Sequence, residues 1–333
     1  RYVVLDNLTI QGSANGFNID VGGEVDNPDA SAYFIIKNSV ISSTGGGNND
    51  TIKASGVNNL TIVNNTLTGA GNGSGIDFVG CHDSVISGNT ISGGMLSGIQ
   101  TKGGSSDIII HGNTIENITT AGARAINAGG STGTAFFRPP LVSKLTDPSA
   151  VNYEAARIIM LANIINSVDS AIAYTGCVDC VFANNTIIDP AVWIVRILQE
   201  TVTDMTYTFA EAQNGEFLNN IIRYSTADIT SALRVVNIGA NTQPATFDFN
   251  HNLWWAYNET AGYITTLPAQ ITAETNSLYQ LDPLFSTIPT DLHISATSPV
   301  IGQGTDNVSG TIGRDFDDNP FTSPPAIGAF EGP

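Results

Sequence analysis

NTISGGMLSGIQTKGGSSDIIIHGNTI, residues 89–115, is the stretch of sequence that decides the fold. It opens and closes on the same Asn-Thr-Ile phrase, and between the two lie short β-type runs that end at Gly or Asn. No helical periodicity runs through it. Three short strands in a period of about 24 residues describe a coil that advances by one strand spacing, about 4.8 Å, per turn.

The same period repeats along most of the chain. The asparagine phrase recurs, with small variations, at Asn38, Asn65, Asn89, Asn113, Asn163, Asn185, Asn220 and Asn252. A strand ending in Gly lies between these phrases and begins at Ile52, Ile76, Ile99, Ile126 and Ile172. An asparagine at one corner can hydrogen-bond its counterparts above and below and tolerates left-handed backbone. A β-propeller would need antiparallel blades of about 40 residues, which the sequence lacks. The pattern predicts an all-β parallel β-helix of about ten coils.

The organisation follows from where the period breaks. Residues 1–255 are predicted to form the β-helix, with an insertion rich in Pro and aromatic residues at 131–157 and a second excursion near 201–214. Residues 256–333 are less periodic and are predicted to be a closing segment that covers the last coil. No cover is visible at the N-terminal coil. We therefore expect either that a preceding segment was removed or that this coil associates head to tail with another copy.

The composition and charge of the chain exclude some classes of function and favour others. The chain carries 12 Lys+Arg against 30 Asp+Glu, a net charge of −18, and no basic stripe, which excludes a nucleic-acid partner. No apolar run approaches the ~18 residues of a membrane helix, so no membrane insertion is expected. Few lysines and abundant Asn, Thr, Ser and Gly favour a secreted or cell-surface protein, trimmed of any signal peptide. Nine sequons would permit a glycoprotein; they begin at Asn7, Asn49, Asn59, Asn64, Asn72, Asn117, Asn184, Asn258 and Asn307.

Three cysteines cannot form a disulfide framework. At least one of Cys81, Cys177 and Cys180 must stay unpaired within the chain. The spacing of Cys177 and Cys180 is like that of a metal site, but no second pair or nearby His completes one. For this pair we favour a free buried cysteine or a local bridge over a metal.

The rungs and the tail resemble a known group of proteins. The coils over about residues 1–255, and tail phrases such as Asp282-Pro-Leu-Phe and Ile312-Gly-Arg-Asp-Phe-Asp-Asp-Asn-Pro, are similar to those of secreted right-handed parallel β-helix proteins of the pectate-lyase-like superfamily. This resemblance implies a right-handed, single-stranded helix. By fold analogy it also implies work on polysaccharides.

A stripe of polar residues is the candidate site. Aligning the Gly-ended strands on their inward Ile places on one outer stripe Lys53, Asp77, Gln100, Lys102 and Asn127. Such a face is a groove for an extended sugar chain. Arg124 lies just before the last of these strands, and Arg138 and Glu154 lie on the insertion that could fold over it. The window 101–157 has a net charge of +1, while the rest of the chain has −19.

These residues suggest β-elimination of a uronate-containing polysaccharide. A cation must neutralise the uronate carboxylate so that the adjacent C–H becomes acidic, and a base must take the proton. Lys102 is the expected base and Arg124 the neutraliser, because a separation of 22 residues places them about one coil apart; certain lyases of this superfamily have a similar pair. No cofactor is required. A Ca²⁺ site, as such enzymes often have, would fall to Asp77 with Asn127.

Other interpretations stay open. Glycoside hydrolysis needs two carboxyl groups, which Asp77 with Glu154 or Glu200 would supply. Arg196, with Trp193 and Glu200, would form a sugar-binding platform or a packed strand with a local ion pair. Glu154 would otherwise pair with Arg157, and Lys102 and Arg124 would otherwise decorate a solvated face. A non-catalytic surface or filament protein is the alternative of another class.

Overall fold

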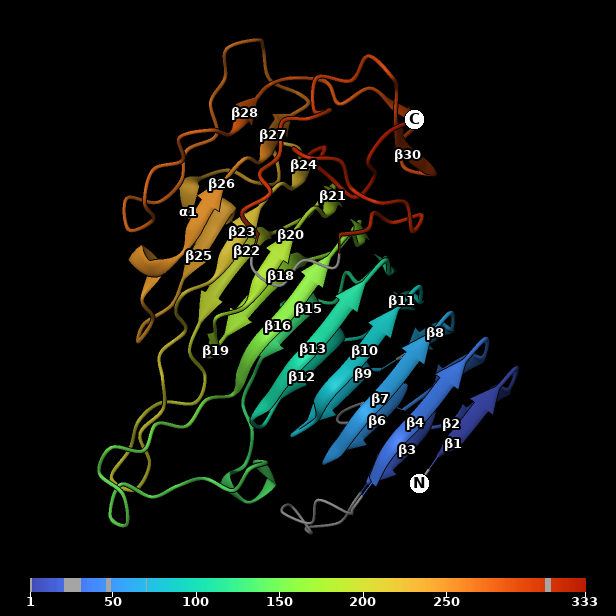
Figure 1. Cartoon of the computed structure of the whole chain (residues 1–333), viewed down its shortest axis with the longest axis vertical. Helices are drawn as coiled ribbons and strands as arrows, with labels where there is room; N and C mark the ends of the chain where they lie inside the picture. The colour runs from blue at the N-terminus through green and yellow to red at the C-terminus, as the bar shows by residue number, and fades with distance from the viewer. Residues whose placement is uncertain (1, 21–30, 46–48, 70, 309–312) are drawn as a thin grey trace.

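The computed structural model describes residues 2–20, 31–45, 49–69, 71–308 and 313–333, and its strands stack into three parallel sheets (Figure 1). In sheet A the strands are β1 (Val3–Asp6), β4 (Ser31–Lys37), β7 (Val57–Val63), β10 (His82–Ser87), β13 (Ser105–His111), β16 (Ala155–Leu161), β20 (Val181–Ala183), β23 (Glu216–Leu218) and β26 (Asp248–Asn250), with β19 (Cys177–Val178) beside β16. Each strand pairs in parallel with its counterpart one coil away.

The other two sheets complete each coil. In sheet B the strands are β2 (Thr9–Ser13), β5 (Val40–Ser43), β8 (Thr66–Gly69), β11 (Thr90–Gly93), β14 (Thr114–Glu116), β17 (Ile164–Asn166), β21 (Thr186–Ile188), β24 (Ile221–Tyr224), β27 (Leu253–Ala256) and β28 (Leu278–Tyr279). In sheet C they are β3 (Phe17–Asp20), β6 (Ile52–Ser55), β9 (Ser74–Val79), β12 (Ser97–Lys102), β15 (Arg124–Gly129), β18 (Ser170–Thr175), β22 (Trp193–Leu198) and β25 (Val236–Ile238). The predicted parallel β-helix of ten or so coils is confirmed.

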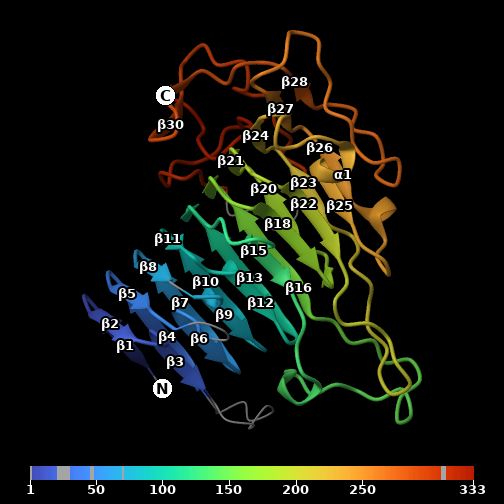
Figure 2. The same cartoon turned by 180° about the vertical axis from the view of Figure 1, so that it is seen from behind.

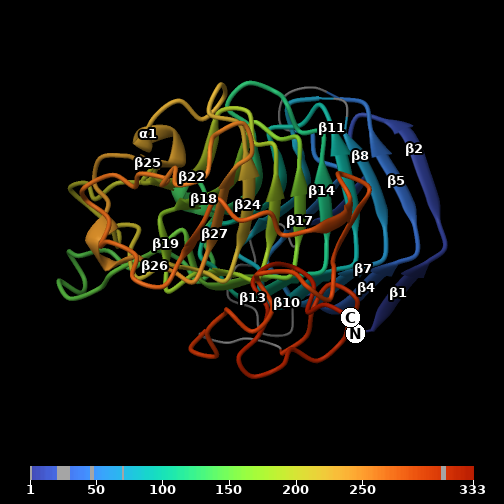
Figure 3. The ribbon, with the colours of Figure 1, turned by 90° about the horizontal axis from the view of Figure 1, so that it is seen from above.

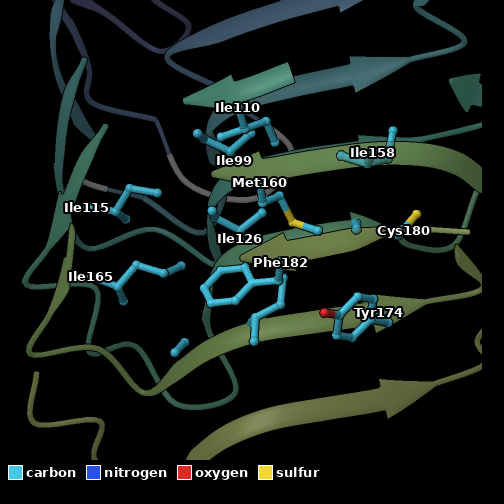
Figure 4. Close-up of a cluster of buried hydrophobic side chains, with 14 of the residues drawn as sticks. Ile99, Ile110, Ile115, Ile126, Ile158, Met160, Ile165, Tyr174, Cys180 and Phe182 are labelled. Carbon is cyan, nitrogen blue, oxygen red and sulfur yellow. The ribbon is translucent and has the colours of Figure 1, made fainter. Parts of the chain in front are cut away.

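The core is built of side-chain columns that run along the helix axis. In sheet A the register stacks, one per coil, Ile36, Ile62, Ile86, Ile110, Met160, Phe182, Phe217 and Phe249. Figure 4 shows the middle of this column meeting the inward residues of the other sheets. The column widens toward the C-terminus, where Phe182 and Phe217 stack with ring centroids 5.4 Å apart. Burial of these side chains, at roughly 1.5–3 kcal/mol each, is the main stabilising term.

A ladder of buried asparagines forms the corner between sheets A and B. The side-chain Nδ2 of each donates to Oδ1 of the next, at 2.9–3.1 Å, from Asn65 through Asn89, Asn113, Asn163, Asn185 and Asn220 to Asn252. Asn38 does not belong to it, since Ser39 holds the equivalent position. The left-handed residue is the one before each rung of the ladder, such as Asn64 (φ 57°) and Ala162 (φ 52°). The sequence pattern predicts both the hydrogen-bond ladder and the left-handed backbone at one asparagine, whereas the structure places them at adjacent positions.

Two long loops leave the coil at the corner between sheets C and A. The segment from 130 to 154, which contains the 3-10 turn Thr134–Phe136, lies against the segment from 199 to 215 (Figure 2). Ser143 bridges Tyr207, and the rings of Phe137 and Phe209 lie 5.6 Å apart. Each loop therefore stabilises the other.

The closing segment differs from its prediction. Residues near Tyr263, Leu267 and Ile271 do pack on the last coil, and the Glu274 carboxylate accepts hydrogen bonds from the indole of Trp254. The remainder, including the antiparallel pair β29 (Phe285–Thr287) and β30 (Asp291–Ile294), folds back beside the coils (Figure 3). Its Phe330 and Leu292 cover the outward Ile188 of sheet B, because that strand is apolar on both faces.

Short helical turns are few. The four-residue helix α1 (Ala232–Val235) lies between β24 and β25, and a 3-10 turn spans Pro244–Thr246. In the part of the chain that the structure describes, no helix has the length and apolar character needed to cross a membrane.

Candidate active site on the outer face of sheet C

The strand register sets the outer stripe. One column of outward residues runs, rung by rung, through Lys53, Asp77, Gln100, Asn127, Ala173 and Arg196. Lys102 stands two residues further along its strand, beside Val79 on the rung below. This is the arrangement that the alternation predicts, and it brings side chains from residues 53 to 196 onto one face.

Asp77 lies at the centre of a charged cluster. Its side chain is 1% exposed, yet Lys53 Nζ lies 2.6 Å from Oδ2 and Lys102 Nζ lies 3.4 Å from Oδ1. Lys102 Nζ also donates to Gln100 Oε1 at 3.5 Å. The two lysine side chains remain partly exposed, 25% for Lys53 and 16% for Lys102. A buried carboxylate therefore holds two cations at the surface of the stripe.

Asp50 belongs to this cluster and was not predicted. It lies just before β6, where its Oδ2 is 3.1 Å from Lys53 Nζ and its Oδ1 accepts from the backbone N–H of Ser74 at 2.7 Å. Burial, and then the charge of Asp77, raise the pKa of Asp50. Burial lowers the pKa of Lys53, but the contacts with Asp77 and Asp50 outweigh it, so that this pKa is raised. The one sequence signal for Asp50 is its position 24 residues before Ser74, which is the spacing of one coil.

Arg124 occupies a second cluster further along the stripe. Its Nη2 lies 2.5 Å from Glu200 Oε1, and its Nη1 donates to Thr175 Oγ1 at 3.4 Å. Thr175 Oγ1 in turn donates to Asn127 Oδ1 at 2.7 Å. The Arg124 side chain is 14% exposed. Glu200 thus pairs with Arg124 and not with Arg196.

Lys102 and Arg124 lie further apart along the strand direction than their sequence spacing suggests. They are on neighbouring rungs, but Arg124 pairs with Ser97, at the opposite end of the strand that ends with Lys102. Five residues of strand span roughly 16 Å. The Arg124 side chain recovers part of this distance by reaching Thr175, which pairs with Gly129 at the opposite end of β15.

Glu154 and Arg138 lie outside these clusters and secure the long loop. Glu154 is buried, and both its oxygens accept hydrogen bonds, from Gly103 N, from Thr132 N and Oγ1, and from Thr201 Oγ1. Arg157 pairs with Asp107 at 2.7 Å and not with Glu154. Arg138 Nη1 donates to Asn58 Oδ1 at 2.6 Å. Their contacts explain how the loop is tied to the coil.

Arg196 packs on an aromatic ring. Its guanidinium carbon lies 4.2 Å from the ring centroid of Trp193, and its Nε donates to Asn237 Oδ1 at 3.2 Å. Burial, and then the neighbouring charge of Arg124, lower the pKa of Arg196 to about 10. It remains cationic at neutral pH. The C-terminal half of the stripe is therefore a cation beside an indole.

The charged groups of this site that a substrate could contact are cations. The groups that reach the surface are ammonium and guanidinium groups, whereas Asp50, Asp77 and Glu154 are buried. A Ca²⁺ ion held by Asp77 and Asn127 would have to displace an ammonium group from the first and Thr175 from the second. Within the described ranges, no three His, Cys, Asp or Glu residues gather as metal ligands.

The structure distinguishes between the two alternatives for the cysteine pair. Cys177 and Cys180 form a local disulfide, and Cys81 is a free, buried thiol. None of them is among the residues of the stripe.

Comparison with known proteins supports the fold. Residues 1–137 match the family model described as "Right handed beta helix region". No curated protein matches the chain. Solved structures that it resembles include an alginate lyase from Paenibacillus sp. str. FPU-7 (14% identity, 83% of this chain and 87% of that one, TM-score 0.44). Pectate lyase Pel9A has 10% identity over 99% of this chain and 87% of that one, with a TM-score of 0.44. XylC in complex with xylose has 13% identity over 91% of this chain but 51% of that one, with a TM-score of 0.47. The match over residues 1–137 agrees with the sheet topology above, which is that of a right-handed parallel β-helix.

Proposed function

We propose that the protein is an extracellular polysaccharide lyase that cleaves a uronate-containing chain by β-elimination. The observation that carries the proposal is the buried carboxylate of Asp77 in contact with the ammonium groups of two partly exposed side chains, Lys53 and Lys102. A negatively charged polymer would meet cations on this face, although the whole chain carries a net charge of −18. Local charge, rather than net charge, governs the approach of a substrate.

The proposal assigns a role to each charged residue. Lys102 first loses a proton to solvent, and its neutral amine then takes the proton from the carbon next to the uronate carboxylate. The electrons of that C–H bond form the double bond, and the glycosidic C–O bond breaks with its electrons on the leaving oxygen, which takes a proton from water. Lys53 and Arg124 offset the charge that develops on the carboxylate. Asp77 is a positioning residue, because it contacts both lysines and is itself shielded from solvent.

Hydrolysis is less well served by these residues. It needs two carboxyl groups that reach the scissile bond. Glu154 has both oxygens engaged, and Asp77 is 1% exposed and bound by two lysines. Glu200 is exposed but is paired with Arg124.

The test is a digest of a panel of uronate and neutral polysaccharides, followed by the absorbance of unsaturated uronates and by reducing ends. We expect absorbance with a uronate polymer, at least 100-fold less with Lys102→Ala, and no loss with Lys37→Ala, a surface lysine paired with Asp6. EDTA should leave the rate unchanged, because ammonium groups occupy the contacts of Asp77. Reducing ends without absorbance would contradict the proposal in favour of hydrolysis. Silence in both assays would contradict it in favour of a non-catalytic surface or filament role.

A further inference from the structure

A second cationic centre lies at the C-terminal end of the stripe. Trp193 begins β22, and two guanidinium groups pack against its indole: Arg196 at 4.2 Å and Arg234 at 5.6 Å from the ring centroid. Arg234 comes from α1, which contacts β22 and β25 (Figure 1). Its Nη1 donates to the carbonyl of Val192 at 3.3 Å, which fixes the side chain beside the indole.

Neither arginine has a carboxylate partner. Among the residues that the structure describes, no carboxylate oxygen lies within 4.0 Å of the Arg196 or Arg234 guanidinium. Glu200 is taken by Arg124. Asp169, which is close enough to influence Arg196 electrostatically, accepts from Gly122 N and Ser170 Oγ.

This lack of compensation is unusual for so acidic a chain. A partly buried cation normally has a counter-charge, because desolvation without one is costly. Toward the residues with described positions, Arg196 makes one side-chain hydrogen bond, through Nε, which leaves its Nη groups able to donate to a ligand. Two guanidinium groups with free N–H donors match the paired oxygens of a carboxylate or a sulfate.

The position of this centre relates it to the proposed reaction. Arg196 stands in the same outward column as Gln100, three rungs away through Asn127 and Ala173. At about 4.8 Å per rung, the two positions are roughly 14 Å apart. An extended chain that runs along the stripe past Lys102 would therefore meet Trp193 with a different sugar unit.

We propose that Arg196 and Arg234 form a distal subsite for the oxyanion of a second sugar unit, with Trp193 fixing the two guanidinium groups. The inference rests on the proposed function for the path of the chain. It goes further by requiring anionic groups on more than one unit. The substrate class is thus a polymer with runs of anionic sugars, and a chain with isolated uronates would bind weakly.

The experiment measures binding by calorimetry with three ligands: an acidic uronate hexamer, the same hexamer fully methyl-esterified, and an oligosaccharide of neutral sugars whose only charged groups are sulfates. For Arg196→Gln/Arg234→Gln we expect at least 10-fold weaker binding of the acidic hexamer, little change for the ester, and a raised KM with an unchanged kcat. Arg157→Gln, in which a surface arginine paired with Asp107 is replaced, is the matched control. A response to the sulfated ligand as large as that to the hexamer would assign the subsite to sulfate rather than carboxylate.

The outcomes separate this inference from the proposed function. Should the double variant bind the acidic hexamer within twofold of the wild type, or lose affinity equally for the ester, the subsite is refuted even if lyase activity is present. Should the wild type bind through these arginines and yet release no unsaturated product, the subsite stands and the lyase does not. Arg196→Lys/Arg234→Lys keeps the charge and serves if the glutamine variant fails to fold.

Discussion

The asparagine ladder makes a sharp prediction for Asn113→Ala. Asn113 is fully buried; its Oδ1 accepts from Asn89 N and Nδ2, and its Nδ2 donates to Ile86 O, His111 O and Asn163 Oδ1, all at 3.0–3.2 Å. Truncation removes these five bonds. Two acceptors keep another donor: His111 O retains Gly88 N, and Asn163 Oδ1 retains the backbone N–H at position 113.

The buried N–H of Asn89 loses its side-chain acceptor, which costs about 1–3 kcal/mol, and each other lost bond costs about 0.5–1.5 kcal/mol. Allowing for the acceptors that stay satisfied, we expect unfolding to become easier by about 3–5 kcal/mol. Urea titration followed by circular dichroism measures this difference. Asn72→Ala, at an exposed turn, is the control and should change stability by less than about 0.5 kcal/mol. A loss below about 1 kcal/mol for Asn113→Ala would show that the ladder does not stabilise the coil beyond an ordinary surface amide.

Three further predictions test other parts of the molecule. His293 lies 2.6 Å from both Asp291 and Asp317; burial opposes, but these carboxylates outweigh it and raise the pKa of the imidazole. Its stabilising contribution is complete below the unfolded-state pKa of about 6.5 and is lost as pH rises through the higher folded pKa; the thermal midpoint should fall over this range, and a profile unchanged in His293→Gln would contradict the assignment. Burial raises the pKa of Cys81 to about 12, so a thiol reagent should label it only after unfolding, and rapid labelling of the folded protein would count against this packing. The sequon at Asn184 is buried, so peptide mapping after expression in a glycosylating host should find it unmodified. A glycan on Asn184 would contradict its burial at the corner between sheets A and B.

Periodicity in the sequence predicts what repeats once per coil. The Gly-ended strands align as their Ile residues indicate, because an inward Ile on every rung leaves one register that buries all of them. The ladder follows for the same reason, except at its N-terminal end, where the sequence pattern indicates Asn38 but Ser39 holds the position. One residue is enough to move a side chain from the ladder to the left-handed position before it.

What does not repeat was harder to predict. The spacing of 22 residues between Lys102 and Arg124 is five short of the 27 that separate the paired Ser97 and Arg124, and those five residues are a displacement along the strand rather than a change of coil. Asp50 and Arg234 sit outside the strands, in connections whose course no pattern specifies. The return of the closing segment beside sheet B depends on tertiary contacts of Phe330 with Ile188, which sequence alone does not reveal.

Because equivalent rungs are stacked at a regular spacing, the length of the stripe is set by the number of coils. Each added or deleted coil of about 24 residues would lengthen or shorten the binding face by one step of about 4.8 Å, while the columns and the ladder on either side keep their register. Under the proposed function, the number of sugar units between the Asp77 cluster and Trp193 would then be set by the number of rungs rather than by any single side chain. Relatives with more or fewer coils between these two points would select polymers by the interval between their charges.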